Sequence, residues 1–148
     1  MDEMSLSEFA DKMIEFMPMI MKEFGKRVSE IYKGKITLPQ VLIMDFLNKN
    51  GESKMTDIAK FMGVTTAAMT GIIDRLVKSG YVLRSHDQHD RRITKIKPTI
   101  KGSVLIKKVN DQRKQMIFNI FEKISKEDRT IYMRIITKMH DTLSGEHV

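Results

Sequence analysis

A charged hairpin pattern in the middle of the chain places the tightest restriction on the possible fold. The polar stretch from Arg84 to Arg92 is followed by the alternating segment Ile93 to Lys97, and it is preceded by β-forming residues that start at Tyr81. Directly upstream, residues 54–79 carry two short helical patterns. We therefore expect a helix pair and a basic β-hairpin to lie together in one small part of the molecule.

The positive charge of the chain is concentrated in the same segment. Residues 54–101 hold ten Lys and Arg against four Asp and Glu, an excess of six, whereas the excess of the whole chain is seven. Because each neutralised phosphate releases condensed counterions, a polyanion is the natural partner of such a surface. The alternative, a solvated basic face, accounts less well for the coincidence with a helix pair and a hairpin.

Two long amphipathic segments flank this centre. Residues 6–32 place apolar side chains three and four apart, and Pro18 is expected to kink this helix without ending it. Residues 100–124 repeat the pattern, and Ser125 is expected to cap a last helix. The flanking segments hold more apolar surface than a small lobe can cover alone, which predicts burial across a two-fold interface.

Shorter helices are predicted between the first segment and the hairpin. Thr37 with Gln40 forms a capping-box pattern, Thr56 is expected to cap a helix over 57–62, and a helix over 65–79 follows. The buried stripe of that last helix is predicted as Met69, Ile72, Ile73, Leu76 and Val77.

The opposite face of the helix over 65–79 is suited to close approach into a DNA major groove, because small and hydroxyl-bearing side chains can contact base edges or a thymine methyl. The candidate DNA-binding residues on this face are Thr65, Thr66, Ala67, Thr70, Gly71 and Arg75. In the hairpin, Arg91 and Arg92 are the candidates, and Asp90 is positioned to hold Arg92 as it enters a narrow minor groove. A surface ion pair in a loop is the alternative for this last motif.

The predicted fold class is mainly α with a small β-wing, that is, a winged helix-turn-helix with a helical dimerisation lobe. Residues 1–148 are expected to form a single domain. Within it, residues 37–102 form the DNA-binding lobe, and residues 5–33 and 103–144 form the dimerisation lobe.

Several motifs together resemble the MarR family of bacterial and archaeal transcription regulators. They are the run Met55 to Ala59, then Gly63-Val64-Thr65, then Asp74 to Arg84, then Asp87 with Asp90-Arg91-Arg92, and finally Thr99 to Gly102. The resemblance implies a DNA-binding homodimer on a pseudo-palindromic operator, in which the helix over 65–79 reads the major groove and Arg92 reaches the minor groove. Repression of transcription is the predicted outcome. The alternative is a winged-helix protein-interaction module that does not bind DNA.

The resemblance also implies a pocket for a small aromatic or anionic effector between the two lobes. The residues that the sequence offers for it are Phe16, Ile20, Phe24, Met44, Arg113 and Met116, with Arg113 as the anchor for an anionic group. Core packing is the alternative explanation for each apolar residue of this set.

Other functional classes find little support in the sequence. The absence of cysteine excludes disulfides, thiolate metal sites and thiol redox sensing. There is no glycine-rich phosphate loop, nucleophile elbow or HExxH motif, so we expect neither an enzyme nor a cofactor. His86 and His89 lack an obvious third ligand, so no metal site is expected. No apolar run spans a bilayer and the first ten residues are acidic and polar, which predicts no membrane segment and a cytoplasmic protein.

Overall fold

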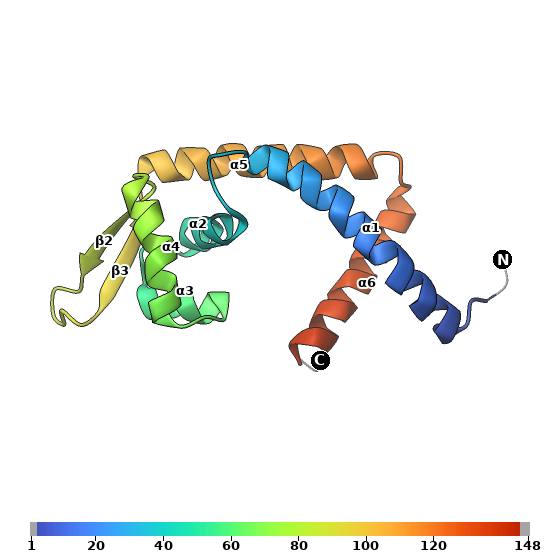
Figure 1. The fold of residues 1–148 in the computed structure, drawn as a ribbon, viewed down its shortest axis with the longest axis horizontal. Coiled ribbons are helices and arrows are strands. Elements are labelled where there is room, and N and C mark those ends of the chain that lie inside the picture. The colour runs from blue at the N-terminus through green and yellow to red at the C-terminus, as the bar shows by residue number, and fades with distance from the viewer. Residues whose placement is uncertain (1–2, 146–148) are drawn as a thin grey trace. The chain divides into compact units, whose positions relative to one another are not determined.

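The computed structural model describes residues 3–145 and consists of six helices and one small sheet within that range. This result confirms the prediction of a mainly α fold with a small β-wing. The elements in chain order are α1 (Leu6–Tyr32), α2 (Leu38–Asn50), β1 (Ser53–Lys54), α3 (Met55–Met62), α4 (Thr66–Lys78), β2 (Val82–His86), β3 (Thr94–Pro98), α5 (Ile100–Phe121) and α6 (Lys126–Ser144) (Figure 1).

The chain divides into two compact units, Met1–Gln112 and Arg113–Val148. The first unit contains α1 to α4, the sheet and the first half of α5, and the second contains the rest of α5 and α6. The predicted division into a DNA-binding lobe over 37–102 and a dimerisation lobe over 5–33 and 103–144 stays a prediction. Among residues 3–145, no helix combines the length and the hydropathy that a membrane span requires.

The sheet has three antiparallel strands in the order β1-β3-β2. β2 and β3 form the expected hairpin (Figure 1). In it, Val82 pairs with Pro98 and His86 pairs with Thr94. The third strand, β1, is not among the predicted elements, and it pairs Ser53 with Ile96. A two-residue strand is too short to show an alternating pattern, because two residues are compatible with any structure. It nevertheless joins the start of α3 to the hairpin.

One predicted helix boundary is wrong. α3 begins at Met55 with Lys54 at its N-cap, so Thr56 lies inside the first turn and is not the cap. The reason is the pairing of β1 with β3, which holds the backbone extended up to Lys54 and leaves the next residue free to start the helix. The other cap expectations are confirmed: Thr37 N–H donates to Gln40 Oε1 at 2.9 Å, and the Asp128 N–H donates to Ser125 Oγ at 3.0 Å.

The core of the first unit lies between α2, α3, α4 and the sheet. Fully buried side chains such as Ile43, Ile58, Ile73 and Ile96 come from these four elements. α5 contributes Ile106 and Val109 to the same cluster. The helix pair and the hairpin are thus fixed to one another through shared apolar contacts.

The buried stripe of α4 is narrower than predicted. Met69, Ile73 and Leu76 are buried and Ile72 is partly buried, but Val77 is 36% exposed. At 3.6 residues per turn, Val77 lies about 80° around the helix from Met69, which carries it to the edge of the core-facing side. The prediction for Val77 is therefore wrong, because the apolar pattern of the sequence is wider than the face that packs.

α1 is continuous through Pro18, in agreement with the prediction that this residue does not end the helix. Its first turn has a capping box, since the Glu8 N–H donates to Ser5 Oγ and the Ser5 N–H donates to Glu8 Oε2. Tyr32 is the one buried residue of α1, while Phe9, Phe16 and Ile20 are about half exposed. The apolar stripe of α1 is therefore largely uncovered in the single chain.

Candidate nucleic-acid interface

The front of α4 is built to leave its first turn open at the surface. Thr65 is the N-cap, and its Oγ1 accepts a hydrogen bond from the Ala68 N–H at 3.1 Å. The residues that follow on the outer side, Thr66, Ala67 and Thr70, are all exposed. Because Met69 and Ile73 anchor the opposite side in the core, this outer side has a fixed orientation.

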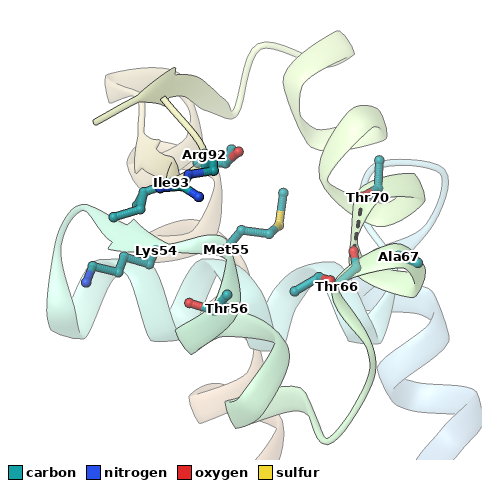
Figure 2. A pocket seen from close by; sticks show the side chains of 9 residues that line it. Lys54, Met55, Thr56, Thr66, Ala67, Thr70, Arg92 and Ile93 are labelled. Atoms are coloured by element: carbon teal, nitrogen blue, oxygen red, sulfur yellow. Dashed lines mark hydrogen bonds between the residues drawn. The ribbon is translucent and has the colours of Figure 1, made fainter. Parts of the chain in front are cut away.

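An open groove of about 510 Å³ lies beside this helix. Three segments form its walls: the start of α3, the front of α4 and the approach to β3 (Figure 2). The lining residues are Lys54, Met55, Thr56, Thr66, Ala67, Thr70, Arg92, Ile93 and Thr94. Hydroxyl, methyl and cationic groups therefore converge on one open space.

The groove joins some of the predicted DNA-binding residues and not others. Thr66, Ala67, Thr70 and Arg92 line it. The others, Thr65, Gly71, Arg75 and Arg91, are exposed but are not part of its lining. Whether each of these eight residues contacts DNA stays a prediction.

Lys54 and Thr56 line the groove but are absent from the set of predicted DNA-binding residues. The sequence shows Lys54 only as part of the charge excess, because the unpredicted strand β1 is what carries it to the groove. Thr56 has the pattern of a helix cap, and a capping hydroxyl is not expected to serve as a surface group. Both residues can be identified as groove-lining groups only when the start of α3 is correctly predicted at Met55.

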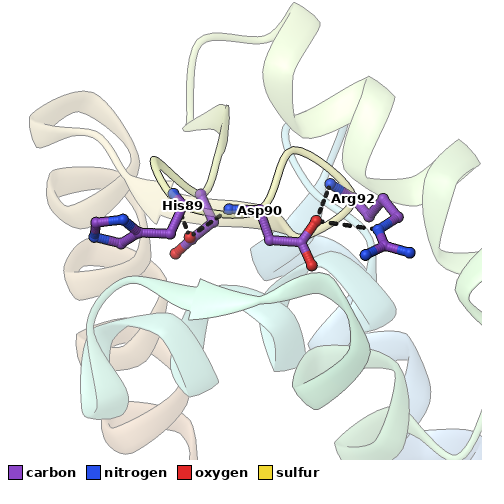
Figure 3. A network of polar contacts seen from close by, with 4 residues as sticks. His89, Asp90 and Arg92 are labelled. Carbon is purple, nitrogen blue, oxygen red and sulfur yellow. Dashed lines mark hydrogen bonds and ion pairs between the residues drawn. The ribbon is translucent and has the colours of Figure 1, made fainter.

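The tip of the hairpin is held by the Asp87 carboxylate. Its Oδ1 accepts hydrogen bonds from the N–H groups of His89 at 2.9 Å and Asp90 at 3.1 Å (Figure 3). Lys95 Nζ lies 2.9 Å from its Oδ2. The hydrogen bond from Lys95, followed by those from the two backbone N–H groups, lowers the pKa of Asp87 to about 2. A carboxylate with these partners stays charged at any physiological pH and fixes the shape of the loop.

Removal of this charge should weaken the fold in a pH-dependent way. The pKa of Asp87 is lower in the folded chain than the ordinary value of 3.8, so its stabilising contribution is present above about pH 4 and is lost as the pH falls toward 2. We expect the melting temperature of Asp87→Asn to lie below that of the wild-type chain at pH 6, with the gap closing as the pH approaches 2. Thermal melts recorded across this range provide the measurement.

Asp11→Asn is the matched control for that experiment. Asp11 is exposed on α1, and within the part of the chain that the structure describes its carboxylate has no hydrogen-bond or ion-pair partner. The melting temperature of Asp11→Asn at pH 6 should therefore be close to that of the wild-type chain. An Asp87→Asn variant that melts like the wild-type chain at pH 6 would show that the hairpin tip is held without this carboxylate.

Asp90 and Arg92 form the interaction that their spacing suggests. Asp90 Oδ1 accepts hydrogen bonds from the Arg92 backbone N–H at 3.0 Å and from Arg92 Nε at 3.2 Å (Figure 3). The Arg92 side chain is nevertheless 91% exposed. Its remaining guanidinium N–H groups are thus directed by Asp90 and stay open to an external acceptor.

Two further contacts connect α4 with its neighbours. Arg84 on β2 forms an ion pair with Asp74 on α4. Lys101 Nζ donates a hydrogen bond to the Ser79 carbonyl at 2.9 Å, at the C-terminal end of α4. A cation at this end of a helix also interacts favourably with the helix dipole. Polar contacts therefore join α4 to the hairpin and to α5, in addition to the shared apolar core.

The residues suggested for an effector pocket occupy different surroundings. Met44 is fully buried in the core of the first unit, whereas Phe16, Ile20 and Phe24 are exposed on α1. Arg113 and Met116 belong to the second unit. The pocket stays a prediction.

The histidines of the hairpin do not gain further ligands from the fold. Within residues 3–145, no group of three or more His, Cys, Asp or Glu side chains is arranged to hold a metal ion. His86 and His89 are exposed near the hairpin tip.

The fold and the groove together define a winged helix-turn-helix protein. Residues 36–94 match the model of the MarR family, a range that runs from the residue before the α2 cap to the start of β3. The uncharacterised HTH-type transcriptional regulator YfiV of Bacillus subtilis is 33% identical over 102 residues, which cover 69% of this chain and 64% of YfiV. The chain thus spans slightly less than two thirds of that relative.

Solved structures agree with this assignment over nearly the whole chain. A MepR-like protein complexed with pseudoligands is 30% identical, with a TM-score of 0.66 over 93% of this chain and 97% of that one. FabT of Streptococcus pneumoniae in complex with DNA is 18% identical, with a TM-score of 0.81 over 93% and 99% of the two chains, and so shares the fold. The chain belongs to the MarR family, and the resemblance to this family that the motifs of the sequence indicate is confirmed.

Proposed function

We propose that this chain is a transcriptional repressor that binds a pseudo-palindromic operator as a homodimer. The observation that carries the proposal is the groove in which the front of α4, the start of α3 and Arg92 of the hairpin converge. α4 is a helix that exposes small and hydroxyl-bearing side chains at its first turns, which suits insertion into the major groove. Repression follows where such an operator overlaps a promoter.

The hairpin would act beside α4 as the wing. Arg92 is exposed and its guanidinium is directed by Asp90, and a narrow minor groove attracts arginine through its negative potential. Lys54 and Thr56 line the groove between α4 and the wing, where a cation and a hydroxyl can hold a backbone phosphate. We assign base reading to Thr66, Ala67 and Thr70, and supporting contacts to Thr65, Gly71, Arg75 and Arg91.

The homodimer is supported by apolar surface that the single chain leaves uncovered. No residue of α6, which the structure describes in full, is buried. Its stripe of Ile131, Ile135, Ile136, Met139 and Leu143 is exposed in every case. Covering such stripes is the usual reason for two-fold association, and a two-fold protein fits a two-fold operator with half-sites about one helical turn apart.

A small aromatic or anionic molecule is proposed as the regulator of binding. Such a ligand would act by binding more tightly to the DNA-incompetent spacing of the two α4 helices than to the competent one. The MepR-like relative complexed with pseudoligands supports a ligand-binding capacity in this fold. Because the chain has no cysteine, thiol oxidation is not the signal.

The alternative is a winged-helix module that binds another protein and not DNA. Neither the repressor nor this module would be an enzyme. The excess of positive charge around α4 and the wing favours DNA, since a protein interface is depleted of lysine at its core. A regulator that acts on chromosomal DNA works in the cytoplasm of a bacterium or archaeon.

The salt dependence of operator binding tests the proposal. Removing one cation that binds a phosphate should reduce the slope of log affinity against log salt concentration by about one. Arg92→Ala and Lys54→Ala should therefore each flatten the slope by about two for a dimer, with weaker binding at physiological salt. Fluorescence anisotropy on operator fragments selected from genomic DNA provides both quantities.

Lys60→Ala is the matched control, since Lys60 is an exposed cation on α3 that does not line the groove. Its slope should stay close to that of the wild-type chain. Equal slopes for the wild-type chain and all three variants would show that the groove is not part of the DNA interface. A wild-type chain that selects no DNA fragment would favour the protein-interaction module.

A further inference from the structure

Two threonines on α4 line the groove one helical turn apart, but their hydroxyl groups are in different states. Thr70 Oγ1 donates a hydrogen bond to the Thr66 carbonyl oxygen at 3.0 Å (Figure 2). The Thr66 hydroxyl has no hydrogen-bond partner among residues 3–145. Thr70 has thus already used its single O–H donor, whereas Thr66 retains both its donor and its acceptor capacity.

This difference decides which group each side chain offers to a ligand. A threonine carries one hydroxyl and one methyl on its β-carbon. With the oxygen of Thr70 turned onto the backbone of its own helix, its methyl is the group left for the groove. Thr66 presents a hydroxyl that can form a hydrogen bond with a partner.

The major groove of DNA offers a matching counterpart for each group. Thymine presents its C5 methyl there, next to the O4 acceptor, while the other bases present hydrogen-bond donors and acceptors. An apolar methyl gains from contact with the thymine methyl and gains nothing from a base amine. A free hydroxyl gains from hydrogen bonds to base edges.

We propose that Thr70 recognises a thymine in each half-site through methyl–methyl contact, and that Thr66 recognises a base edge through its hydroxyl. The proposal rests on the proposed function, because it requires α4 to lie in the major groove. Ala67 lines the same wall of the groove and adds a second methyl beside that of Thr70. The operator half-site therefore contains a thymine whose methyl is part of the recognised surface.

Paired substitutions separate the two kinds of contact. Thr70→Val keeps the shape and the methyl but removes the hydroxyl, and it should bind the operator more tightly than Thr70→Ser does. Thr70→Ser keeps the hydroxyl and removes the methyl, and its affinity should fall by about four-fold per half-site, the value of one buried methyl group. The order reverses at Thr66, where Thr66→Ser keeps the hydroxyl and should bind more tightly than Thr66→Val. The affinity of Thr66→Val should fall by about five-fold per half-site, the value of one hydrogen bond.

Modified operators provide a second test that needs no protein variant. Replacing one thymine at a time with uracil removes only the C5 methyl from the DNA. The affinity of the wild-type chain should fall by about four-fold per half-site at one thymine position. The affinity of Thr70→Ser should fall no further at that same position, because the two methyl groups form a single contact.

The possible outcomes are distinct. If Thr70→Val binds as weakly as Thr70→Ser, or if no uracil substitution weakens wild-type binding, the methyl contact is ruled out even though the chain binds DNA. If Thr66→Val binds as tightly as Thr66→Ser, the hydroxyl contact of Thr66 is ruled out. A wild-type chain that binds no DNA fragment overturns the proposed function together with this inference, and circular dichroism melts of the four variants confirm that each is folded.

Discussion

Gly102→Ala is expected to lower the free energy of unfolding by about 3 kcal/mol, at the upper end of the cost of overpacking a core. A β-carbon on Gly102 would overlap the Tyr81 carbonyl and lie within 2.8 Å of Met44 Cε. The Tyr81 carbonyl cannot retreat easily, because it accepts a hydrogen bond from the Thr99 N–H at 3.0 Å. For a chain of this size the melting temperature should fall by about 10 °C.

Gly71→Ala is the control for the Gly102 variant. Gly71 is also a helical glycine, but a β-carbon there would have no neighbour within 4 Å. Alanine in place of a helical glycine should raise the free energy of unfolding by about 1 kcal/mol. A Gly102→Ala variant as stable as the Gly71→Ala variant in denaturant unfolding would show that α5 can move away from Tyr81 at little cost.

Removing residues 129–148 is expected to weaken operator binding by several orders of magnitude. Arg129 Nη1 donates to the Phe121 and Ile124 carbonyls, each at 3.0 Å, and the ring of Tyr132 lies 5.3 Å from that of Phe121. The truncated chain lacks these interactions together with the exposed apolar stripe of α6. Without a dimer the two half-sites bind independently, so affinity should fall by about 10²- to 10⁴-fold. Light scattering gives the mass of the truncated protein, and anisotropy gives its affinity.

A point substitution makes this prediction independent of the folding of a shortened chain. Ile135 is 50% exposed in the single chain, so Ile135→Glu should leave the folded protomer intact while placing a charge in the stripe. Thr137→Glu adds the same charge to an exposed position outside the stripe and should remain dimeric. A dimeric Ile135→Glu variant with normal operator affinity would place the interface elsewhere on the molecule.

The local elements of the DNA reader could be predicted because short-range chemistry dictates them. The stripe of Met69, Ile73 and Leu76 requires a helix that buries one side. Asp90 and Arg92 are two residues apart, and this spacing alone predicts the hydrogen bond that the structure contains. In each case the interacting groups are close neighbours along the chain, so the sequence contains the whole interaction.

The features that differ from the prediction depend on contacts between segments that are distant in the sequence. Thr56 has the chemistry of a helix cap, but the pairing of Ser53 with Ile96 starts the helix earlier. Lys54 stands out in the sequence only as one charge among ten, because nothing in its neighbours indicates that a strand carries it to the groove beside Thr66. Val77 has the apolar character of a core residue, but the width of the packed face leaves it exposed.

The sequence by itself determined the helix pair, the basic wing, the family and the uncovered apolar stripes, because periodicity, capping and charge are properties of neighbouring residues. The tertiary structure decided which of the exposed groups meet. It placed Lys54 and Thr56 against the front of α4, and it turned the Thr70 hydroxyl onto the Thr66 carbonyl while leaving the Thr66 hydroxyl without a partner among residues 3–145. Such convergence depends on the packing of elements far apart in the chain and on individual side-chain rotamers, and neither is encoded in a local pattern.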